Sequence, residues 1–186
     1  MLIVERIRES RFRYAIPWSM TVARPIIGAD ALKEAQQGNW KNAKKKFAWA
    51  WTTDLEGYPA RYFNATSALG AVGDPIADGI LRAESAKALA PHMPTTATIV
   101  AAAELYNIAI NTKIQQGRTK PYVPLEAKLG TTVQAAGVIW AIDGMEKNSL
   151  LKRTVGRATI YAGTGLRVHA YWKELNKIGQ EKKQNP

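Results

Sequence analysis

Apolar positions, many of them alanine, fill long segments of the chain in a way typical of α-helices, and no stretch alternates with the two-residue period of a strand. Glycine and proline fall mainly between these segments. The pattern predicts an all-α protein, a six-helix bundle with short connections. The expected helices cover residues 17–37, 40–62, 71–89, 95–116, 127–143 and 150–176. We expect a single helical domain over residues 1–179, followed by a mobile basic tail over residues 180–186.

The hydropathy of these segments is low for membrane spans. Residues 93–112 are the most apolar stretch, with Glu104 as their single charge, and residues 129–142 are uncharged but short of the roughly 20 residues of a span. Each lysine between residues 41 and 46 would cost roughly 2.5–3.5 kcal/mol near the centre of a bilayer. The mean hydropathy is -0.24. We therefore expect a helical protein that is soluble or lies at a membrane surface, with at most one or two spans.

The formal net charge of +11 favours polyanionic partners, meaning nucleic acid, anionic lipid or nucleotide phosphates. A solvated basic surface is equally compatible with this charge. The chain has no cysteine, which excludes disulfides and thiolate metal sites.

Aromatic residues flank the lysine run at 41–46, namely Trp40, Phe47, Trp49 and Trp51. Cations beside stacking rings fit a nucleic-acid surface. The same run fits an amphipathic helix at a membrane interface. Aromatic residues at helical spacing are more often core or interfacial anchors, so nucleic acid is the weaker interpretation.

The segment TDLEGYPARYFNATSALGAVGDPIAD, residues 53–78, combines acidic, small and basic residues. Asp74 and Asp78 are four residues apart, so they share one face of a helix. Two carboxylates at this spacing repel unless a cation or a proton lies between them, and Mg²⁺ bound with substrate phosphates is the common case. Glu56 supplies a third carboxylate.

The small and basic residues of this segment favour a phosphate ligand. Gly57 has no side chain and Ala60 has a small one, so a ligand can approach the helix backbone there. Arg61 offers a planar donor for phosphate, and Gly70 turns the chain between two helices. Together with the acidic pair, these residues suggest a metal-bound diphosphate.

A purely structural interpretation is also open. Asp74 can cap the third helix, with Pro75 at its first position. Asp78 is then a surface residue, and Glu56 and Arg61 form an incidental ion pair. The residues alone leave the two interpretations evenly balanced.

The segment resembles the signature of the CDP-alcohol phosphatidyltransferase family, D-x2-D-G-x2-A-R-x8-G-x3-D-x3-D. The residues that match with the family spacing are Gly57, Ala60, Arg61, Gly70, Asp74 and Asp78. Glu56 stands at the second acidic position, and Thr53 stands at the first, with Asp54 next to it. On a helix Asp54 points about 100° away from Thr53. Either the helix is locally distorted to bring Asp54 in, or the site lacks one carboxylate.

Weaker matches flank this core in family order. Pro17, Thr21 and Arg24 resemble an opening P-N-x2-T-x2-R, whereas Lys128, Thr131 and Gln134 resemble G-K-x-K-T-x2-Q of the phosphatidylglycerophosphate synthases. Several positions depart from these patterns. Trp18 replaces the Asn of the first motif, and Ala127 and Gly130 replace the Gly and the second Lys of the second. Glu104 stands where that branch has an Arg-Glu pair, with Ala103 in place of the Arg.

The resemblance implies that a CDP-linked lipid binds with Mg²⁺ or Mn²⁺ and that a small alcohol phosphate displaces CMP. Asp78 is the implied general base. The implied metal ligands are Glu56, Asp74 and Asp78, with Asp54 or Thr53 completing the shell. The implied nucleotide-binding residues are Gly57, Ala60, Arg61 and Gly70. Arg24 and Lys128 are expected to face the acceptor phosphate.

Partners and location follow from the same resemblance together with the charge. We expect an anionic membrane surface on the cytoplasmic side, with a soluble cytoplasmic protein as the alternative, and a homodimer as is usual in the family. Two rival functions stay open at this point. One is a non-catalytic helical descendant of the family that acts as a nucleotide-binding or structural protein. The other is a basic protein that binds nucleic acid or an anionic surface, which only the charge favours.

Overall fold

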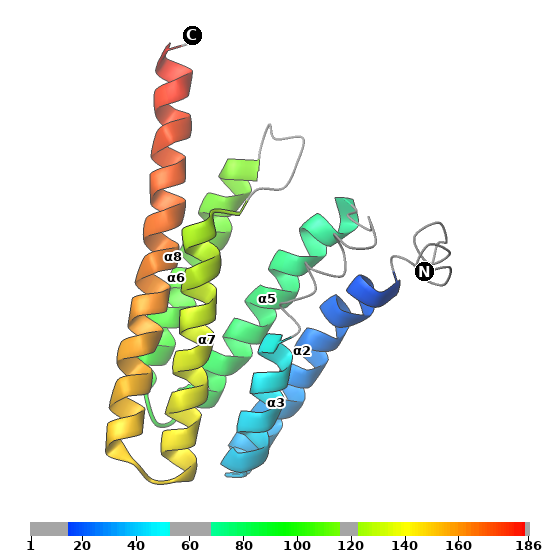
Figure 1. Ribbon diagram of the computed structural model, residues 1–186, viewed down its shortest axis with the longest axis vertical. Coiled ribbons are helices and arrows are strands. Elements are labelled where there is room, and N and C mark those ends of the chain that lie inside the picture. Colours follow the sequence, from blue (N-terminus) through cyan, green and yellow to red (C-terminus); the bar gives the residue numbers. More distant parts are fainter. Residues whose placement is uncertain (1–14, 53–67, 116–122, 185–186) are drawn as a thin grey trace, which may run out of the picture. The chain divides into compact units, whose positions relative to one another are not determined.

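The computed structural model of the chain describes residues 15–52, 68–115 and 123–184, and these ranges contain six helices and no strand (Figure 1). The helices are α2 (Ala15–Gln36), α3 (Trp40–Thr52), α5 (Ala68–Leu89), α6 (Pro94–Gln115), α7 (Leu125–Glu146) and α8 (Leu150–Gln184). The predicted all-α, six-helix architecture is confirmed. Contacts divide the chain into two compact units, residues 1–85 and 86–186. The single domain over residues 1–179 stays a prediction.

Helix boundaries follow local signals. Gly38 lies in the turn that follows α2 and has a φ of 76°. Its N–H donates a hydrogen bond to the Ala35 carbonyl over 3.0 Å. Asn148 has a φ of 47° between α7 and α8. Glycine and asparagine are the residues that adopt this left-handed conformation most readily, so both turns are encoded locally.

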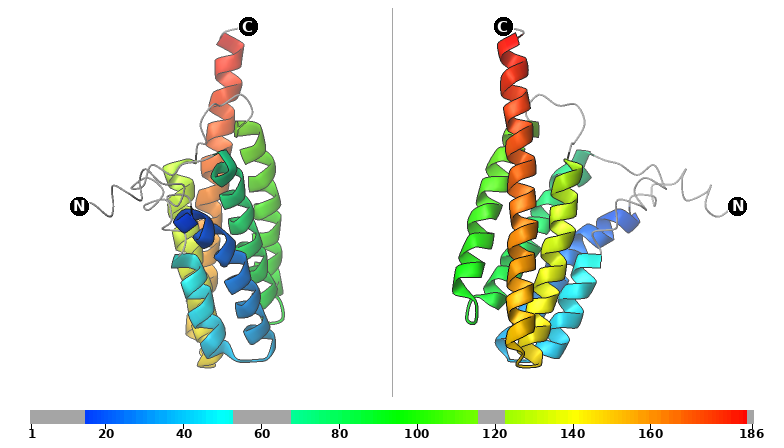
Figure 2. Two further views of the ribbon diagram at one scale, coloured as in Figure 1. Left: turned by 90° about the vertical axis from the view of Figure 1, so that its right-hand side faces the viewer. Right: turned by 60° about the vertical axis from the view of Figure 1, so that its left-hand side comes forward.

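One predicted boundary lies outside the described residues, and another differs from the structure. The described part of the second helix ends at Thr52, and the remainder of its predicted range lies outside the described residues. The last helix was expected to end at Asn176, but α8 continues through Gly179 to Gln184, past α6 and α7 (Figure 2). A single glycine costs a helix only about 1 kcal/mol, so it does not by itself end one. The mobility of residues 180–186 stays a prediction.

In the first unit, α2 and α3 form an antiparallel hairpin. Apolar residues between the helices are buried, among them Ala31, Ala35, Ala43 and Phe47. The Lys46 amine lies 2.7 Å from the Asp30 carboxylate and 2.6 Å from that of Glu34. The hydrogen bond from Lys46 holds the pKa of Glu34 below its usual value, and the bonds to Asp30 and Glu34 raise the pKa of Lys46.

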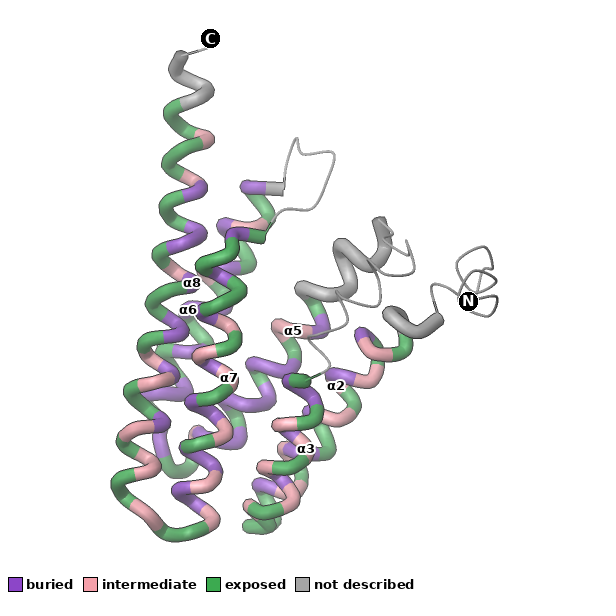
Figure 3. The backbone as a smooth tube through the Cα atoms, viewed as in Figure 1, coloured by how far each residue is buried: buried purple, intermediate pink, exposed green. Residues whose placement is uncertain are grey.

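In the second unit, α7 and α8 pack antiparallel along glycines that recur every seven residues: Gly130, Gly137 and Gly144 on α7, and Gly156 and Gly163 on α8. A Cβ on Gly137 would lie 2.6 Å from the Ile160 nitrogen, and one on Gly156 would lie 2.5 Å from the Ala141 nitrogen. Neither distance leaves room for a side chain. The backbones of α7 and α8 therefore pack directly against each other along these glycines, which we call the glycine seam. Buried positions recur along one side of each helix (Figure 3).

We expect Gly156→Ala to lower the free energy of unfolding by about 1–3 kcal/mol, because the added methyl group would force two backbones apart. Gly165→Ala is the matched control, since a Cβ there meets nothing within 4 Å. Alanine favours a helix over glycine, so the control should be neutral or slightly stabilising. Denaturant unfolding of the two variants measures the difference. Equal stabilities would show that the seam has room to relax.

Within the described ranges, no helix has both the length and the apolar character needed to cross a membrane.

Candidate functional site

The structure describes only some of the predicted site residues. The residues Thr53, Asp54, Glu56, Gly57, Ala60 and Arg61 lie outside the described residues. Gly70 and Asp74 lie on the backbone of α5, as does Asp78 one turn after Asp74. The helical spacing of the two aspartates is therefore present, because α5 runs unbroken from Ala68 to Leu89.

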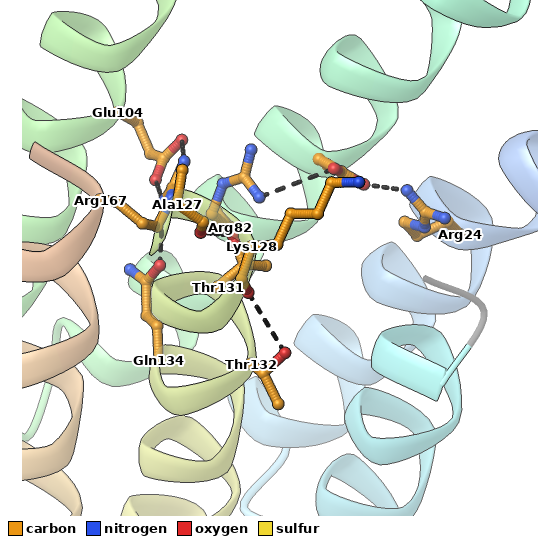
Figure 4. Close-up of polar contacts among 10 residues, drawn as sticks. Arg24, Arg82, Glu104, Ala127, Lys128, Thr131, Thr132, Gln134 and Arg167 are labelled. Atoms are coloured by element: carbon orange, nitrogen blue, oxygen red, sulfur yellow. Dashed lines mark hydrogen bonds and ion pairs between the residues drawn. The ribbon is translucent and has the colours of Figure 1, made fainter. Parts of the chain in front are cut away.

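Asp78 lies between two buried arginines. Its carboxylate is 23% exposed, and its Oδ1 atom forms an ion pair with the Nη1 of Arg24 on α2, a side chain that is 1% exposed. On the other side, Nη1 of Arg82 lies 3.9 Å from Oδ2 (Figure 4). Arg82 is four residues further along α5, so the two side chains share a face of the helix. Each carboxylate oxygen thus faces a different guanidinium group.

A contact between α2 and α5 at Gly28 lies beside the Arg24–Asp78 pair. A Cβ on Gly28 would lie 2.9 Å from the Leu81 Cδ1 atom and would overlap the Glu84 carboxylate, so this glycine lets the helices approach. Arg24 lies one turn before Gly28, and Asp78 lies one turn before Leu81. The Arg24–Asp78 ion pair therefore lies about one turn away from the Gly28 contact, between the same two helices.

Sequence reasoning singled out Arg24 and Asp78 but missed Arg82. The only signal for Arg82 was its spacing of four residues from Asp78, which places a cation beside a carboxylate on any helix. Arg24 was expected to face an acceptor phosphate, whereas here it pairs with Asp78. Its role toward a phosphate stays a prediction.

In the second unit, one buried polar group joins three helices. Nη2 of Arg167 on α8 lies 3.2 Å from the Glu104 carboxylate on α6, and its Nη1 forms an ion pair with the same group. Nη1 also donates to Oε1 of Gln134 on α7 over 2.9 Å (Figure 4). All three side chains are buried. Sequence reasoning noted Glu104 and Gln134 through the family patterns and missed Arg167, which lies in no motif.

The buried group around Arg167 explains why Gly130 stands where the family pattern has a lysine. A Cβ on Gly130 would lie 2.7 Å from the Arg167 Cγ atom and 2.7 Å from the Gly163 carbonyl oxygen. No lysine fits at this position, because the Arg167 stem and the α8 backbone already occupy the space. Lys128, the remaining cation of the motif, is exposed on α7. Its role in acceptor binding stays a prediction.

Divalent metal binding depends on residues that are only partly described. Within the described ranges, no cluster of three or more His, Cys, Asp or Glu residues could hold a metal ion. Glu56 and Asp54 lie outside these ranges. The residue types nevertheless fit, since Asp74 and Asp78 are aspartates one turn apart on α5 and Mg²⁺ prefers carboxylate oxygens.

Comparison with known proteins gives one clear result. The model of the CDP-alcohol phosphatidyltransferase family matches residues 14–166, which is more than half of the chain. No curated protein sequence matches the chain. Members of the family are transferases of phospholipid biosynthesis that act on CDP-linked alcohols and alcohol acceptors, generally with divalent metals, and they are typically membrane-bound. The matched range contains the Arg24–Asp78 pair and the whole acidic segment, and by this match the chain belongs to the CDP-alcohol phosphatidyltransferase family.

Proposed function

We propose that this protein moves a phosphatidyl group from a CDP-linked lipid to a small alcohol phosphate and releases CMP. The observation that supports the proposal best is the contact between Arg24 and Asp78, which are 54 residues apart in the sequence. Each belongs to a different segment that resembles the family. Two segments related only by the family pattern thus contribute to one ion pair.

The proposed metal ions are Mg²⁺ or Mn²⁺. Glu56, Asp74 and Asp78 would hold them, with Asp54 or Thr53 completing the shell. When bound, the metal neutralises the charge of the diphosphate and makes its phosphorus easier to attack. Gly57, Ala60, Arg61 and Gly70 would hold the cytidine diphosphate.

Asp78 is the proposed general base. The acceptor hydroxyl oxygen bonds to the β-phosphorus, the bond from that phosphorus to the CMP oxygen breaks, and Asp78 takes the hydroxyl proton. Arg24 and Lys128 bind the acceptor phosphate. Because Arg24 also pairs with Asp78, an incoming phosphate competes for this guanidinium. Acceptor binding therefore frees a carboxylate oxygen beside the hydroxyl that it must deprotonate.

A second candidate is a non-catalytic descendant of the family that keeps the helical frame and binds a nucleotide or serves a structural role. Two observations favour it. Thr53 replaces the first acid of the signature, and Gly130 has no space for the lysine of the family pattern.

The proposal also includes location and assembly. We propose association with an anionic membrane surface on the cytoplasmic side, with a soluble cytoplasmic protein as the alternative. A homodimer is proposed on the family pattern alone.

Release of CMP separates the two candidates. We expect the purified protein, given CDP-diacylglycerol, Mg²⁺ or Mn²⁺ and a panel of small alcohol phosphates, to release CMP only when metal and one acceptor are both present. A thermal shift with metal and CDP should occur for both candidates. A shift without CMP release under any metal or acceptor would favour the non-catalytic descendant, and absence of both would contradict nucleotide binding.

A further inference from the structure

Arg82 is a buried cation beside the proposed general base, and the proposed reaction gives it no role. Its side chain is 7% exposed, and its Nη1 atom lies 3.9 Å from the Oδ2 atom of Asp78 (Figure 4). Arg24 forms an ion pair with the other carboxylate oxygen, Oδ1, from helix α2. The two oxygens of one carboxylate are therefore paired with cations from two different helices.

The two arginines reach Asp78 in different ways. Arg82 lies on α5 itself, four residues after Asp78, so the helix holds their Cβ atoms about 5–6 Å apart. Arg24 reaches Asp78 from a separate helix, and it is also the residue proposed to bind the acceptor phosphate. Its contact with Oδ1 is thus the one that is broken when the acceptor arrives. The contact between Arg82 and Oδ2 lies within one helix and does not depend on Arg24.

Burial limits how far the Arg82 guanidinium can move. Side chains in a close-packed interior have few alternative positions, and a guanidinium stays charged at any physiological pH. A carboxylate with one oxygen beside such a group cannot turn about its Cβ–Cγ bond without losing that contact. Oδ1 is then the oxygen that faces a new partner after Arg24 has moved.

We propose that Arg82 is a positioning residue for the proton transfer. It holds Oδ2 of Asp78, so that Oδ1 receives the proton of the acceptor hydroxyl once Arg24 has turned to the acceptor phosphate. The inference rests on the proposed transferase function and adds the group that orients its base. Arg82 acts through Asp78 and does not itself touch the reacting atoms.

A purely structural role for Arg82 is the alternative. A cation four residues after a carboxylate stabilises a helix wherever the pair occurs. Loss of such a pair lowers the stability of the protein but leaves the turnover of each folded molecule unchanged. The two interpretations therefore differ in the rate of CMP release by folded protein.

Arg82→Gln should lower kcat for CMP release by roughly 10–100-fold, the usual cost of removing the partner of a functional carboxylate. The KM for the acceptor should change little, because Arg82 does not bind the acceptor phosphate. Arg82→Lys returns a cation to the same helix position and should recover much of the loss. Both variants should keep the thermal shift with Mg²⁺ and CDP, and circular dichroism shows that they are folded at the assay temperature.

A double variant shows whether Arg82 acts through Asp78. Adding Arg82→Gln to Asp78→Asn should not lower the residual CMP release further, because asparagine cannot take the proton that Arg82 helps to direct. Lys147→Gln is the matched control. Lys147 lies four residues after Asp143, with its amine 3.3 Å from that carboxylate, and belongs to no part of the signature. Its kcat and KM should stay near those of the wild type.

Three results would overturn the inference and leave the transferase function standing. Folded Arg82→Gln could keep the wild-type kcat, its loss could add in full to that of Asp78→Asn, or the thermal shift with CDP could fall in proportion to kcat. A wild-type protein that releases no CMP would overturn both proposals, because Arg82 would then have no proton transfer to direct.

Discussion

Asp78→Asn is expected to reduce CMP release by roughly 10²–10⁴-fold while metal-dependent binding of CDP is largely retained, because Glu56 and Asp74 would still hold the metal. The amide keeps the shape of the side chain but cannot take the proton of the acceptor hydroxyl, and this range is typical of losing a general base. The substitution also leaves Arg24 and Arg82 without their shared carboxylate. Activity is therefore compared at a temperature where both proteins are folded, with CDP binding measured by thermal shift.

Asp143→Asn is the matched control, because Asp143 also lies between two cations, Lys147 and Lys152, but belongs to no part of the signature. CMP release by this variant should stay near that of the wild type. If Asp78→Asn also released CMP at the wild-type rate, the assignment of the base would be wrong. If it lost CDP binding in the same proportion, Asp78 would act in binding and not in proton transfer.

Two further substitutions test which residues hold the metal ion. Asp74→Asn should weaken both metal and nucleotide binding, because it removes a charged ligand. Asp54→Asn should behave like Asp74→Asn if Asp54 replaces the first acid of the signature. A silent Asp54→Asn would indicate that Thr53 or water completes the shell.

Arg167→Leu is expected to lower the free energy of unfolding by about 3–5 kcal/mol. The substitution leaves the Glu104 carboxylate buried without its guanidinium partner, and Gln134 loses a donor. Removing one partner of a buried ion pair usually costs this much, since the remaining charge stays desolvated. Denaturant unfolding measures the change.

Replacing both partners should cost far less. In the double variant Arg167→Leu with Glu104→Leu neither charge of this pair remains, so much of the lost stability should return. Lys173→Gln is the exposed counterpart, because Lys173 bonds to Glu126 over 3.0 Å at the surface. Its effect should stay within about 1 kcal/mol. A single variant Arg167→Leu as stable as Lys173→Gln would mean that water reaches the buried pair.

Helices were predictable from the sequence because their causes are local. Alanine-rich segments bounded by glycine and proline predicted the six described helices, and Gly38 marked the end of α2. Boundaries were less predictable where a local signal was weak, as at Gly179, because neighbouring residues on both sides favour the helix.

The candidate site was predictable only in part. Asp74 and Asp78 share a helix face because of their spacing, which any reader of the sequence can count. Arg82 followed the same rule and was overlooked because it lies in no family pattern. Arg167 had no signal of either kind, since its partners lie on two other helices.

By itself the sequence determined the helical class, the spacing of the acidic pair and the resemblance to a family, because each depends on residues close together in the chain. Only the tertiary structure decided that Arg24 meets Asp78, that Arg167 joins Glu104 and Gln134, and that Gly130 has no room for a lysine. These facts depend on which helix faces meet and how closely. Such packing arises from burial summed over whole helices, and no short segment of the chain encodes it.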